Sequence, residues 1–504
     1  MRSESVSSGK KGIRDYFGKP MEKVHHSVDE APKSFYLISD PLDSVRIPRH
    51  SKHSPKVKSV APTSLSRVSK SKSVALIPQP KTTTVQLKTA KSRSKTEIDV
   101  PNSILHTRFQ KDCFKGNWTS TYFLSHMHSD HTAGLSSSFK KGKIYATPTT
   151  CRLVENKYSL PHSIFVPMEI GQRYFLTNVE NSKVIAWIHD AFPNQSLISE
   201  RIQQNEDVTD ISGERRIVCI DVIEANHCPG ACIFLFSIYR WDTSAHLFFT
   251  TLYTGDFRYT PQILSDSVLQ EYTKPSGKQI DHVYIDNTYC QSKYKFPPQK
   301  VVIHTVIHVL KTYYSSLLYS PKEIVVLFGT YSIGKEKVWL AAAEELGLKV
   351  YVNANRKKVI QCFADYETNY KPFITTDPES TPLWIGGFVS IQSVQKEGLD
   401  SRFSKVIIIN PTGWEYAHIA EKAPPPDSSL CNYSFRRSNN IFVYGFPYSE
   451  HSSFSEIQTF LSEINYRSMS FIVPEQGAGD LMKELSESTK TADISDLFKS
   501  KQKE

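Results

Sequence analysis

Four potential metal ligands within six residues constrain this chain more than any other feature of its sequence. A short apolar segment at 122–124 runs directly into His126, His128, Asp130 and His131. Residues two apart on an extended strand point to the same side, so His126 and His128 share a face, and Asp130 and His131 follow on the turn into the next helix. Imidazole and carboxylate groups are common ligands of divalent metal ions. The spacing predicts a site that holds two metal ions side by side.

From residue 101 onward, short apolar runs alternate with amphipathic helical patterns, which favours a layered α/β architecture. We expect helices at 298–318 and at 335–346, with Gly347 ending the second. The polar stretch 191–214 is interpreted as a surface loop. Strands are expected at 217–223, 231–238, 247–253, 283–286, 324–328, 405–409 and 441–444.

The formal net charge of +10 belongs to the first hundred residues, which hold 20 Lys and Arg against 9 Asp and Glu. The remaining residues hold 41 against 42. Residues 51–96 contain eleven basic residues, ten Ser and no acidic or aromatic residue, so they cannot bury enough apolar surface to offset the entropy of ordering. We predict a disordered basic tail at 1–100, which is either plain solvated chain or a nuclear targeting segment with weak nucleic-acid contacts.

The eight cysteines form no CxxC pair, which argues against a disulfide framework and a structural zinc finger. The first twenty residues lack an apolar signal segment, and no apolar run approaches the roughly 18 residues of a membrane helix. We therefore expect a soluble protein of a reducing compartment, without a membrane partner.

Further motifs on both sides of the ligand cluster have the order of the metallo-β-lactamase fold. Asp112 lies in Lys-Asp-Cys-Phe, His227 in Asn-His-Cys-Pro-Gly and Asp256 in Thr-Gly-Asp-Phe-Arg. Together with the segments 284–290, 329–337, 411–414 and 447–453, these motifs resemble the DNA cross-link repair exonucleases of the β-CASP group, the relatives of Artemis. The resemblance covers residues 101–475. It implies an α/β fold, an αββα sandwich at 101–290 and 441–480, an inserted β-CASP cap at 291–440, and a C-terminal tail at 481–504.

The resemblance also implies the site residues. Asp112 would support the ligand loop without binding metal, Asp256 would bridge two ions, and Asp286 would orient a ligand or assist proton transfer. A Cys228 thiolate is an alternative ligand that the complete set argues against. We expect two divalent ions, zinc first, with magnesium or manganese as alternatives for activity. The implied metal ligands are His126, His128, Asp130, His131, His227, Asp256 and His451, and the implied catalytic residues are Asp130, Asp256, Asp286 and His451.

A pocket for a terminal phosphate is the second expected element of the site. Residues 329–335 match most of a Walker A loop, but Glu336 replaces the required hydroxyl, which argues against an ATPase. The backbone N–H groups of this helix N-terminus could hold a phosphate, or the segment could be an ordinary tight turn. His304 and His308 have zincin spacing without the general-base Glu, and we interpret them as structural. The candidates for phosphate contact are Asp286, Thr288, Tyr289, Ser332, Lys335 and Ser452.

By resemblance, the activity is a two-metal 5′-to-3′ DNA exonuclease that prefers 5′-phosphate ends and acts in interstrand cross-link repair. The alternative is an RNA-processing β-CASP endonuclease. Gln476 fits neither the Val of the DNA-acting members nor the His of the RNA-acting members, so the DNA assignment depends on the other motifs. The full ligand set argues against a non-catalytic binding module, and the cap motifs argue against a small-molecule hydrolase.

The expected partners are DNA, mainly 5′-phosphorylated single strands or ends, and a sliding clamp. Residues 10–17 resemble a clamp-binding peptide in which Ile13, Tyr16 and Phe17 have one-turn spacing, although Lys10 stands where the family pattern has Gln. We expect a monomer located in the nucleus.

Overall fold

The computed structural model describes residues 110–112, 114, 121–177, 215–241, 245–320, 322–387, 389–473, 481 and 485. The expected tail at 1–100, the clamp-like peptide at 10–17, the loop at 191–214 and Gln476 lie outside these residues. In the described ranges, no helix is long and apolar enough to cross a membrane.

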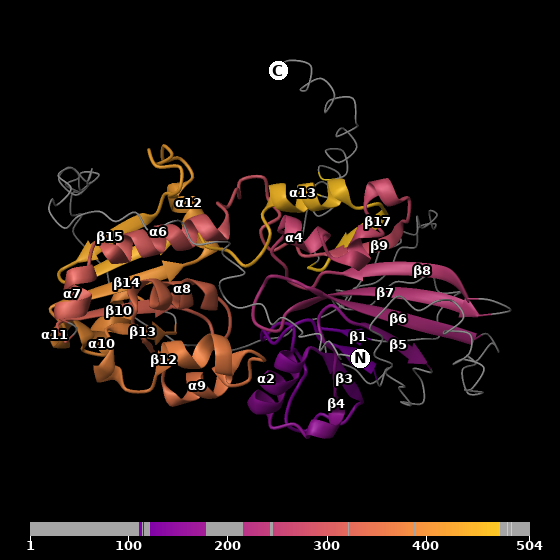
Figure 1. The fold of residues 1–504 in the computed structure, drawn as a ribbon, viewed down its shortest axis with the longest axis horizontal. Helices are drawn as coiled ribbons and strands as arrows, with labels where there is room; N and C mark the ends of the chain where they lie inside the picture. Colours follow the sequence, from indigo (N-terminus) through magenta and orange to yellow (C-terminus); the bar gives the residue numbers. More distant parts are fainter. Residues whose placement is uncertain are drawn as a thin grey trace, which may run out of the picture. The chain divides into compact units, whose positions relative to one another are not determined.

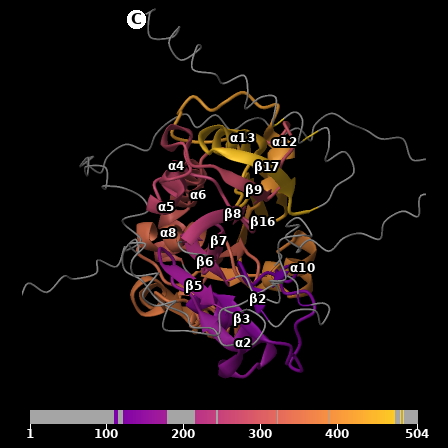
Figure 2. The same cartoon turned by 90° about the vertical axis from the view of Figure 1, so that its right-hand side faces the viewer.

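Two β-sheets form the part of the described chain that contains the ligand loop (Figure 1). The first is parallel throughout and consists of β1 (Gln110–Lys111), β2 (Thr121–Phe123), β3 (Lys143–Ala146) and β4 (Phe165–Pro167). The second has the order β17-β9-β8-β7-β6-β5. Its strands are β5 (Arg173–Thr177), β6 (Arg215–Glu224), β7 (Cys232–Trp241), β8 (Ala245–Tyr253), β9 (Ile280–Ile285) and β17 (Tyr466–Phe471). Figure 2 shows β9 to β5 following one another across this sheet.

The alternation of side chains along β7 explains how the two sheets pack. Phe234 and Phe236 contact Phe123 of β2, with ring centroids 5.5 and 5.0 Å apart, in a cluster between the sheets. Ile233 and Leu235 point to the opposite face and join a second cluster. Successive side chains of a strand point to opposite faces of its sheet, so both faces of β7 are buried. This is expected for a strand that is covered on both sides.

Short helices cover the outer faces of the two sheets. In Figure 1, α2 lies beside β3 and β4, whereas α4 and α13 lie beside β9 and β17. This arrangement is the αββα sandwich that the motifs predicted. The helices are α2 (Pro148–Tyr158), α4 (Pro261–Leu264), α5 (Ser267–Gln270) and α13 (Phe454–Glu463).

In the structure, the cap extends beyond residue 440 to the start of α13 and contains a seven-stranded sheet with the order β12-β11-β13-β10-β14-β16-β15, in which only β15 is antiparallel to its neighbour. Its strands are β10 (Ile324–Gly329), β11 (Val350–Tyr351), β12 (Ile374–Thr375), β13 (Leu383–Gly386), β14 (Lys405–Pro411), β15 (Ser434–Ser438) and β16 (Ile441–Phe446). Its α-helices are α6 (Gln299–Lys311), α7 (Tyr314–Tyr319), α8 (Glu336–Leu346), α9 (Ala354–Ile360), α10 (Ile391–Lys396), α11 (Leu399–Arg402) and α12 (Tyr416–Ile419).

Short 3-10 and π segments connect these elements. They are η2 (His162–Ile164), η3 (Lys274–Ser276), η4 (Tyr366–Tyr370), η5 (Lys371–Phe373), η6 (Pro378–Ser380) and η7 (Gly413–Glu415).

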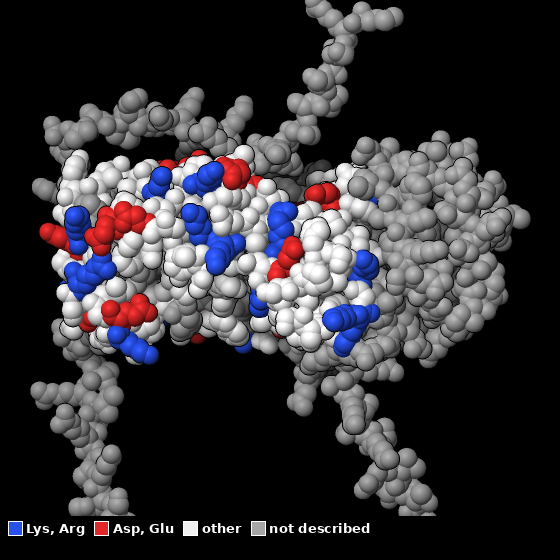
Figure 3. Space-filling model, turned by 90° about the horizontal axis from the view of Figure 1, so that it is seen from below, with Lys and Arg blue, Asp and Glu red and all other residues white. Residues whose placement is uncertain are grey.

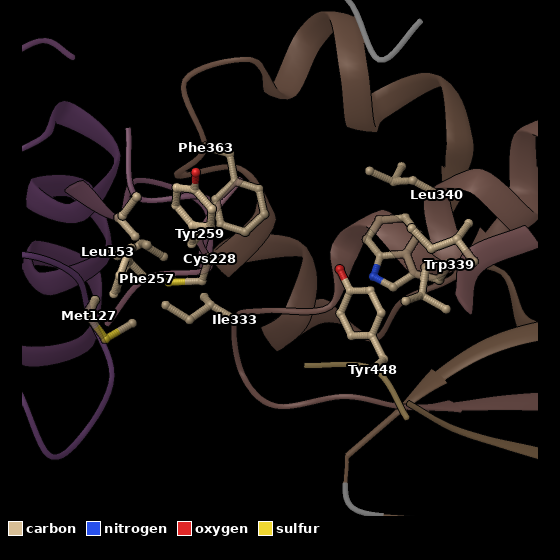
Figure 4. Packing of buried hydrophobic residues seen from close by; sticks show 14 of the residues in the cluster. Met127, Leu153, Cys228, Phe257, Tyr259, Ile333, Trp339, Leu340, Phe363 and Tyr448 are labelled. Carbon is tan, nitrogen blue, oxygen red and sulfur yellow. The ribbon is translucent and has the colours of Figure 1, made fainter. Parts of the chain in front are cut away.

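One continuous apolar cluster joins the sandwich to the cap (Figure 4). Met127 and Phe257 of the sandwich belong to it together with Ile333, Trp339 and Tyr448 of the cap. Burial of large apolar side chains is the main favourable contribution to packing. The cluster therefore fixes the cap against the ligand loop.

Three expectations differ from the structure. Residues 441–446 form β16, which pairs with β14 in the cap sheet, so the chain returns to the sandwich only with α13 and β17. The helix expected at 298–318 breaks at Tyr313, which has φ −103° and ψ 5° and whose hydroxyl lies 2.6 Å from that of Tyr444. Asp130 and His131 lie on a turn at 129–134 as expected, but this turn leads to β3 and not directly into a helix, and the next helix is α2.

Candidate metal centre

Three imidazole nitrogens converge at the segment that follows β2. His126 Nε2 lies 3.0 Å from His128 Nδ1, and His227 Nε2 lies 3.1 Å from the same atom. Burial lowers the pKa of all three imidazoles, and neighbouring histidines lower those of His126 and His227 further. The rings are therefore neutral near pH 7, and converging neutral nitrogens provide the lone pairs that a divalent metal ion requires.

Asp256 lies between this first group of imidazoles and a second group, which consists of His131 and His451. Its Oδ2 is 3.2 Å from His131 Nε2, 3.5 Å from His126 Nε2, 3.9 Å from His227 Nε2 and 4.0 Å from His451 Nδ1. Burial alone would raise the pKa of Asp256, but His131 and His451 hold it well below its usual range. An ionised carboxylate that reaches both groups of imidazoles suits a bridging ligand, and the donor set fits two divalent ions.

A glycine allows Asp256 to approach the ligand loop. Gly255 follows β8 with φ +54°, and a Cβ on it would lie 2.7 Å from both Cβ and Oγ of Ser125. Any other residue would combine a strained backbone with a steric clash. The turn after β8 therefore packs directly on the residue that precedes His126.

Asp112 supports the ligand loop from within the sandwich. Its carboxylate accepts hydrogen bonds from the backbone N–H of Ser125 at 2.7 Å, the Ser125 hydroxyl at 2.6 Å and the Tyr253 hydroxyl at 2.9 Å. It also lies 2.9 Å from His131 Nδ1. Burial opposes a charge on His131, but Asp256 and Asp112 outweigh it and raise its pKa well above the usual value. This geometry turns Nε2 of His131 toward Asp256.

Main-chain carbonyl groups of the cap orient two other candidate ligands. His227 Nδ1 lies 2.7 Å from the carbonyl oxygen of Glu450, and His128 Nε2 lies 3.3 Å from that of Ile333. A metal-binding histidine commonly donates its other N–H to such a partner, which fixes the ring and its tautomer. The cap therefore contributes to a site whose donors come mostly from the sandwich.

Asp286 holds His451 at the end of β9. Its Oδ2 lies 2.8 Å from His451 Nδ1, and its Oδ1 accepts from the backbone N–H and the hydroxyl of Thr288 at 2.9 and 2.7 Å. Burial lowers the pKa of His451, but Asp286 and Asp256 outweigh burial and raise it to about 9. The contact supports the expectation that Asp286 orients a ligand.

The N-terminus of α8 does not offer the free phosphate cradle that we expected. Glu336 Oε1 accepts from the backbone N–H of Gly334 at 2.9 Å, and Glu450 Oε1 accepts from that of Lys335 at 2.6 Å. Burial raises the pKa of Glu450, and burial together with Glu450 raises that of Glu336 to about 7. These two carboxyl groups occupy the N–H groups that a phosphate would need.

The other phosphate candidates divide into two groups. Thr288 and Ser332 are exposed, and Lys335 places Nζ 4.2 Å from the centre of the Tyr331 ring. Ser452 is buried. Its hydroxyl donates to the carbonyl oxygen of Phe257 and accepts from the backbone N–H of Tyr259, each at 2.9 Å. Ser452 therefore joins two segments of the sandwich and has no hydroxyl proton left for a ligand.

The sequence also pointed to Asp130, Cys228 and His304. The side chain of Asp130 is 60% exposed, and its Oδ2 lies 3.5 Å from His131 Nε2. Cys228 adjoins the first group of imidazoles, but burial and then Glu450 raise the pKa of its thiol well above the usual value, which disfavours the thiolate form. His304 lies on α6 and contacts the carbonyl oxygen of Ser429 at 3.2 Å.

Sequence reasoning missed the supporting groups. Ser125, Tyr253, Ile333 and Glu450 had no assigned role, although each contacts a ligand or the carboxylate that holds one. Glu450 had the only readable signal, because a charged residue directly precedes the ligand candidate His451 in a largely buried segment.

Comparisons with known proteins agree with this geometry. The family described as DNA repair metallo-beta-lactamase matches residues 369–476. The chain is 31% identical over 363 residues to the DNA cross-link repair protein SNM1 of Arabidopsis thaliana, covering 70% of this chain and 60% of that protein. It is 30% identical over 351 residues to the human DNA cross-link repair 1A protein (68% and 27%) and 29% identical over 344 residues to the 5′ exonuclease Apollo of Danio rerio (68% and 46%). The chain therefore spans less than two thirds of the length of each of these relatives. The chain is therefore similar to the DNA repair metallo-beta-lactamase family at residues 369–476, and to DNA cross-link repair proteins over about 70% of its length.

Proposed function

We propose that this protein is a metal-dependent phosphodiesterase that shortens DNA from 5′-phosphorylated ends in the repair of interstrand cross-links. The observation that carries the proposal is the position of Asp256. One of its carboxylate oxygens, Oδ2, lies within 4.0 Å of imidazoles from three separate segments of the chain. The names of the relatives, which include a 5′ exonuclease and DNA cross-link repair proteins, support the choice of DNA.

The donor set supports zinc as the resident ion, because imidazole is a better ligand for zinc than for magnesium. The residues proposed to hold two ions are His126, His128, Asp130, His131, His227, Asp256 and His451. When bound, two such ions act as Lewis acids that polarise a phosphodiester and activate water for in-line attack.

The chain itself supplies orientation and charge around the phosphate. Asp286 holds His451 in one orientation through the 2.8 Å contact. Asp130 is the proposed exposed donor, with Oδ2 3.5 Å from His131 Nε2. Lys335 and the exposed Thr288 and Ser332 remain the proposed partners of the terminal phosphate.

A comparison of substrates tests the proposal. The full chain loaded with zinc is incubated with single-stranded DNA carrying a 5′-phosphate, the same DNA with a 5′-hydroxyl, and RNA of the same sequence, each labelled at the 3′ end. We expect products that shorten from the 5′ end, fastest for phosphorylated DNA. Internal cuts confined to RNA would instead establish the RNA-processing alternative.

The basic tail and the clamp-like peptide belong to the proposal as tethering elements. We propose a nuclear protein whose residues Ile13, Tyr16 and Phe17 bind a sliding clamp, and which acts as a monomer. In Figure 3, basic and acidic side chains are mixed on the face shown, which supports attraction to DNA through the tail rather than through a uniform field on that face.

A further inference from the structure

Three neighbouring parallel strands of the cap direct their carboxyl ends toward the metal centre. In the seven-stranded sheet, β14 pairs with β10 on one side and with β16 on the other. Tyr331 follows β10, Trp414 follows β14 in η7, and His451 follows β16. Ligands of open α/β sheets bind at this edge, so Tyr331 and Trp414 lie where a substrate of the metal centre would pass.

Both aromatic side chains are exposed. Tyr331 is 54% exposed and Trp414 is 62% exposed. A large indole is normally well buried, because leaving its apolar surface in water is unfavourable. Exposed aromatic rings beside a binding site commonly provide contact surface for a ligand.

Buried contacts hold these exposed rings near the centre. The Tyr289 ring lies between Trp414 and the ligand candidate His451, with centroids 5.5 and 6.0 Å away. A Cβ on Gly413 would lie 2.8 Å from the ring carbon Cζ and the hydroxyl of Tyr289, so only glycine allows η7 to pack this closely. Tyr331 lies two residues before Ile333, whose carbonyl oxygen is 3.3 Å from His128 Nε2, so its segment also adjoins the candidate metal centre.

A cation accompanies the rings. Lys335 Nζ lies 4.2 Å from the centre of the Tyr331 ring, a cation–π distance that holds the ammonium group beside the aromatic surface. Single-stranded nucleic acid is commonly held by stacking of its bases on aromatic side chains while basic groups contact the backbone. Every base has a flat π face, so this grip does not depend on sequence.

We propose that Tyr331 and Trp414 form a stacking platform for the nucleobases next to the end of single-stranded DNA at the metal centre. The inference rests on the proposed function and adds the means by which bases, rather than phosphates, are held. It assigns these two side chains to substrate binding and leaves the metal donors unchanged.

The test separates stacking from phosphate contact. The probe is a 5′-phosphorylated DNA 12-mer, compared with the same oligonucleotide carrying abasic residues at its first three positions. Binding is measured with the full chain carrying Asp256→Asn, so that the probe stays intact, and 2-aminopurine at the second position reports stacking by fluorescence quenching. We expect the intact probe to bind about tenfold more tightly than the abasic probe.

Variants of the platform distinguish its role from a structural one. Trp414→Ala and Tyr331→Ala should each reduce the preference for the intact probe and the quenching, whereas Trp414→Phe should keep most of both. Tyr319→Ala removes an 84% exposed ring at the end of α7 and serves as the control. A loss in the two alanine variants, with none in the control, supports the platform.

Failure of the platform and failure of the proposed function give different results. Equal affinity for intact and abasic probes in the Asp256→Asn protein without further changes would overturn the stacking platform alone. An unchanged preference after adding Trp414→Ala or Tyr331→Ala to that protein would do the same. The proposed function fails separately if the chain with native Asp256 does not degrade phosphorylated DNA in the presence of zinc.

Discussion

The sandwich and the cap support the same metal centre in different ways. In the sandwich, one buried carboxylate, that of Asp112, contacts Ser125, Tyr253 and His131. In the cap, the groups that reach the ligands are main-chain carbonyls of Ile333 and Glu450. Support from the sandwich therefore depends on the identity of a side chain, whereas support from the cap depends on the path of its backbone. Substitutions in the two regions should differ accordingly.

The largest effect is expected for Asp256→Asn, which removes the donor shared by both groups of imidazoles. The amide cannot carry the negative charge that two ions require, so cleavage of phosphorylated DNA should fall by well over the roughly 10- to 100-fold typical of losing an outer-sphere partner. Cleavage rate and zinc content by mass spectrometry provide the measurement, and circular dichroism should show an intact fold. Full activity in this variant would exclude Asp256 from the centre.

A smaller loss is expected for Asp112→Asn. The amide nitrogen of Asn would face the N–H and hydroxyl donors of Ser125 and Tyr253 and could not accept from them. Zinc affinity should therefore fall by about 10- to 100-fold and the free energy of unfolding by about 2–4 kcal/mol. Competition with a chelator and urea denaturation measure the two quantities. Asp221→Asn is the matched control, because Asp221 is equally buried but pairs with Arg173 at 2.6 Å. It should lose stability without losing zinc affinity.

The smallest of the three effects is expected for Glu450→Ala. It removes the acceptor for the Lys335 N–H but keeps the backbone carbonyl that His227 contacts, so zinc affinity should fall by about tenfold at most. Glu415→Ala is the control, since Glu415 is a buried cap carboxylate that bonds Ser434 at 2.6 Å. If Glu450→Ala weakened zinc binding more than Asp112→Asn, the contrast between side-chain and backbone support would be wrong.

The sequence predicted the parts of the molecule that depend on local spacing. His126, His128 and His131 follow a strand at fixed intervals. Seven strands have readable apolar runs, namely β6, β7, β8, β9, β10, β14 and β16, whereas polar strands such as β15 and β17 have none. The carbonyls of Ile333 and Glu450 could not be predicted, because every residue has a carbonyl group and only the folded path selects these two. The same limit explains β16: a buried parallel strand has the same apolar pattern whichever sheet it joins.

The α8 N-terminus illustrates the limit most clearly. Its Gly and Lys residues suggested a phosphate cradle, but the side chain that occupies the Lys335 N–H comes from Glu450, 115 positions later in the sequence. No local pattern indicates such a distant partner. The expected phosphate contact at Ser452 had the same weakness, since its hydroxyl is used by Phe257 and Tyr259 far upstream.

The separation of the donors along the chain has a consequence for biosynthesis. His126 leaves the ribosome early, whereas His451 and its neighbour Glu450 emerge only after the whole cap sheet has been made. Contacts between such distant segments form late in folding, since the intervening chain must first be ordered. A nascent or truncated chain that ends before β16 lacks both His451 and the carbonyl that contacts His227, so the proposed centre stays incomplete until the whole cap sheet has been made.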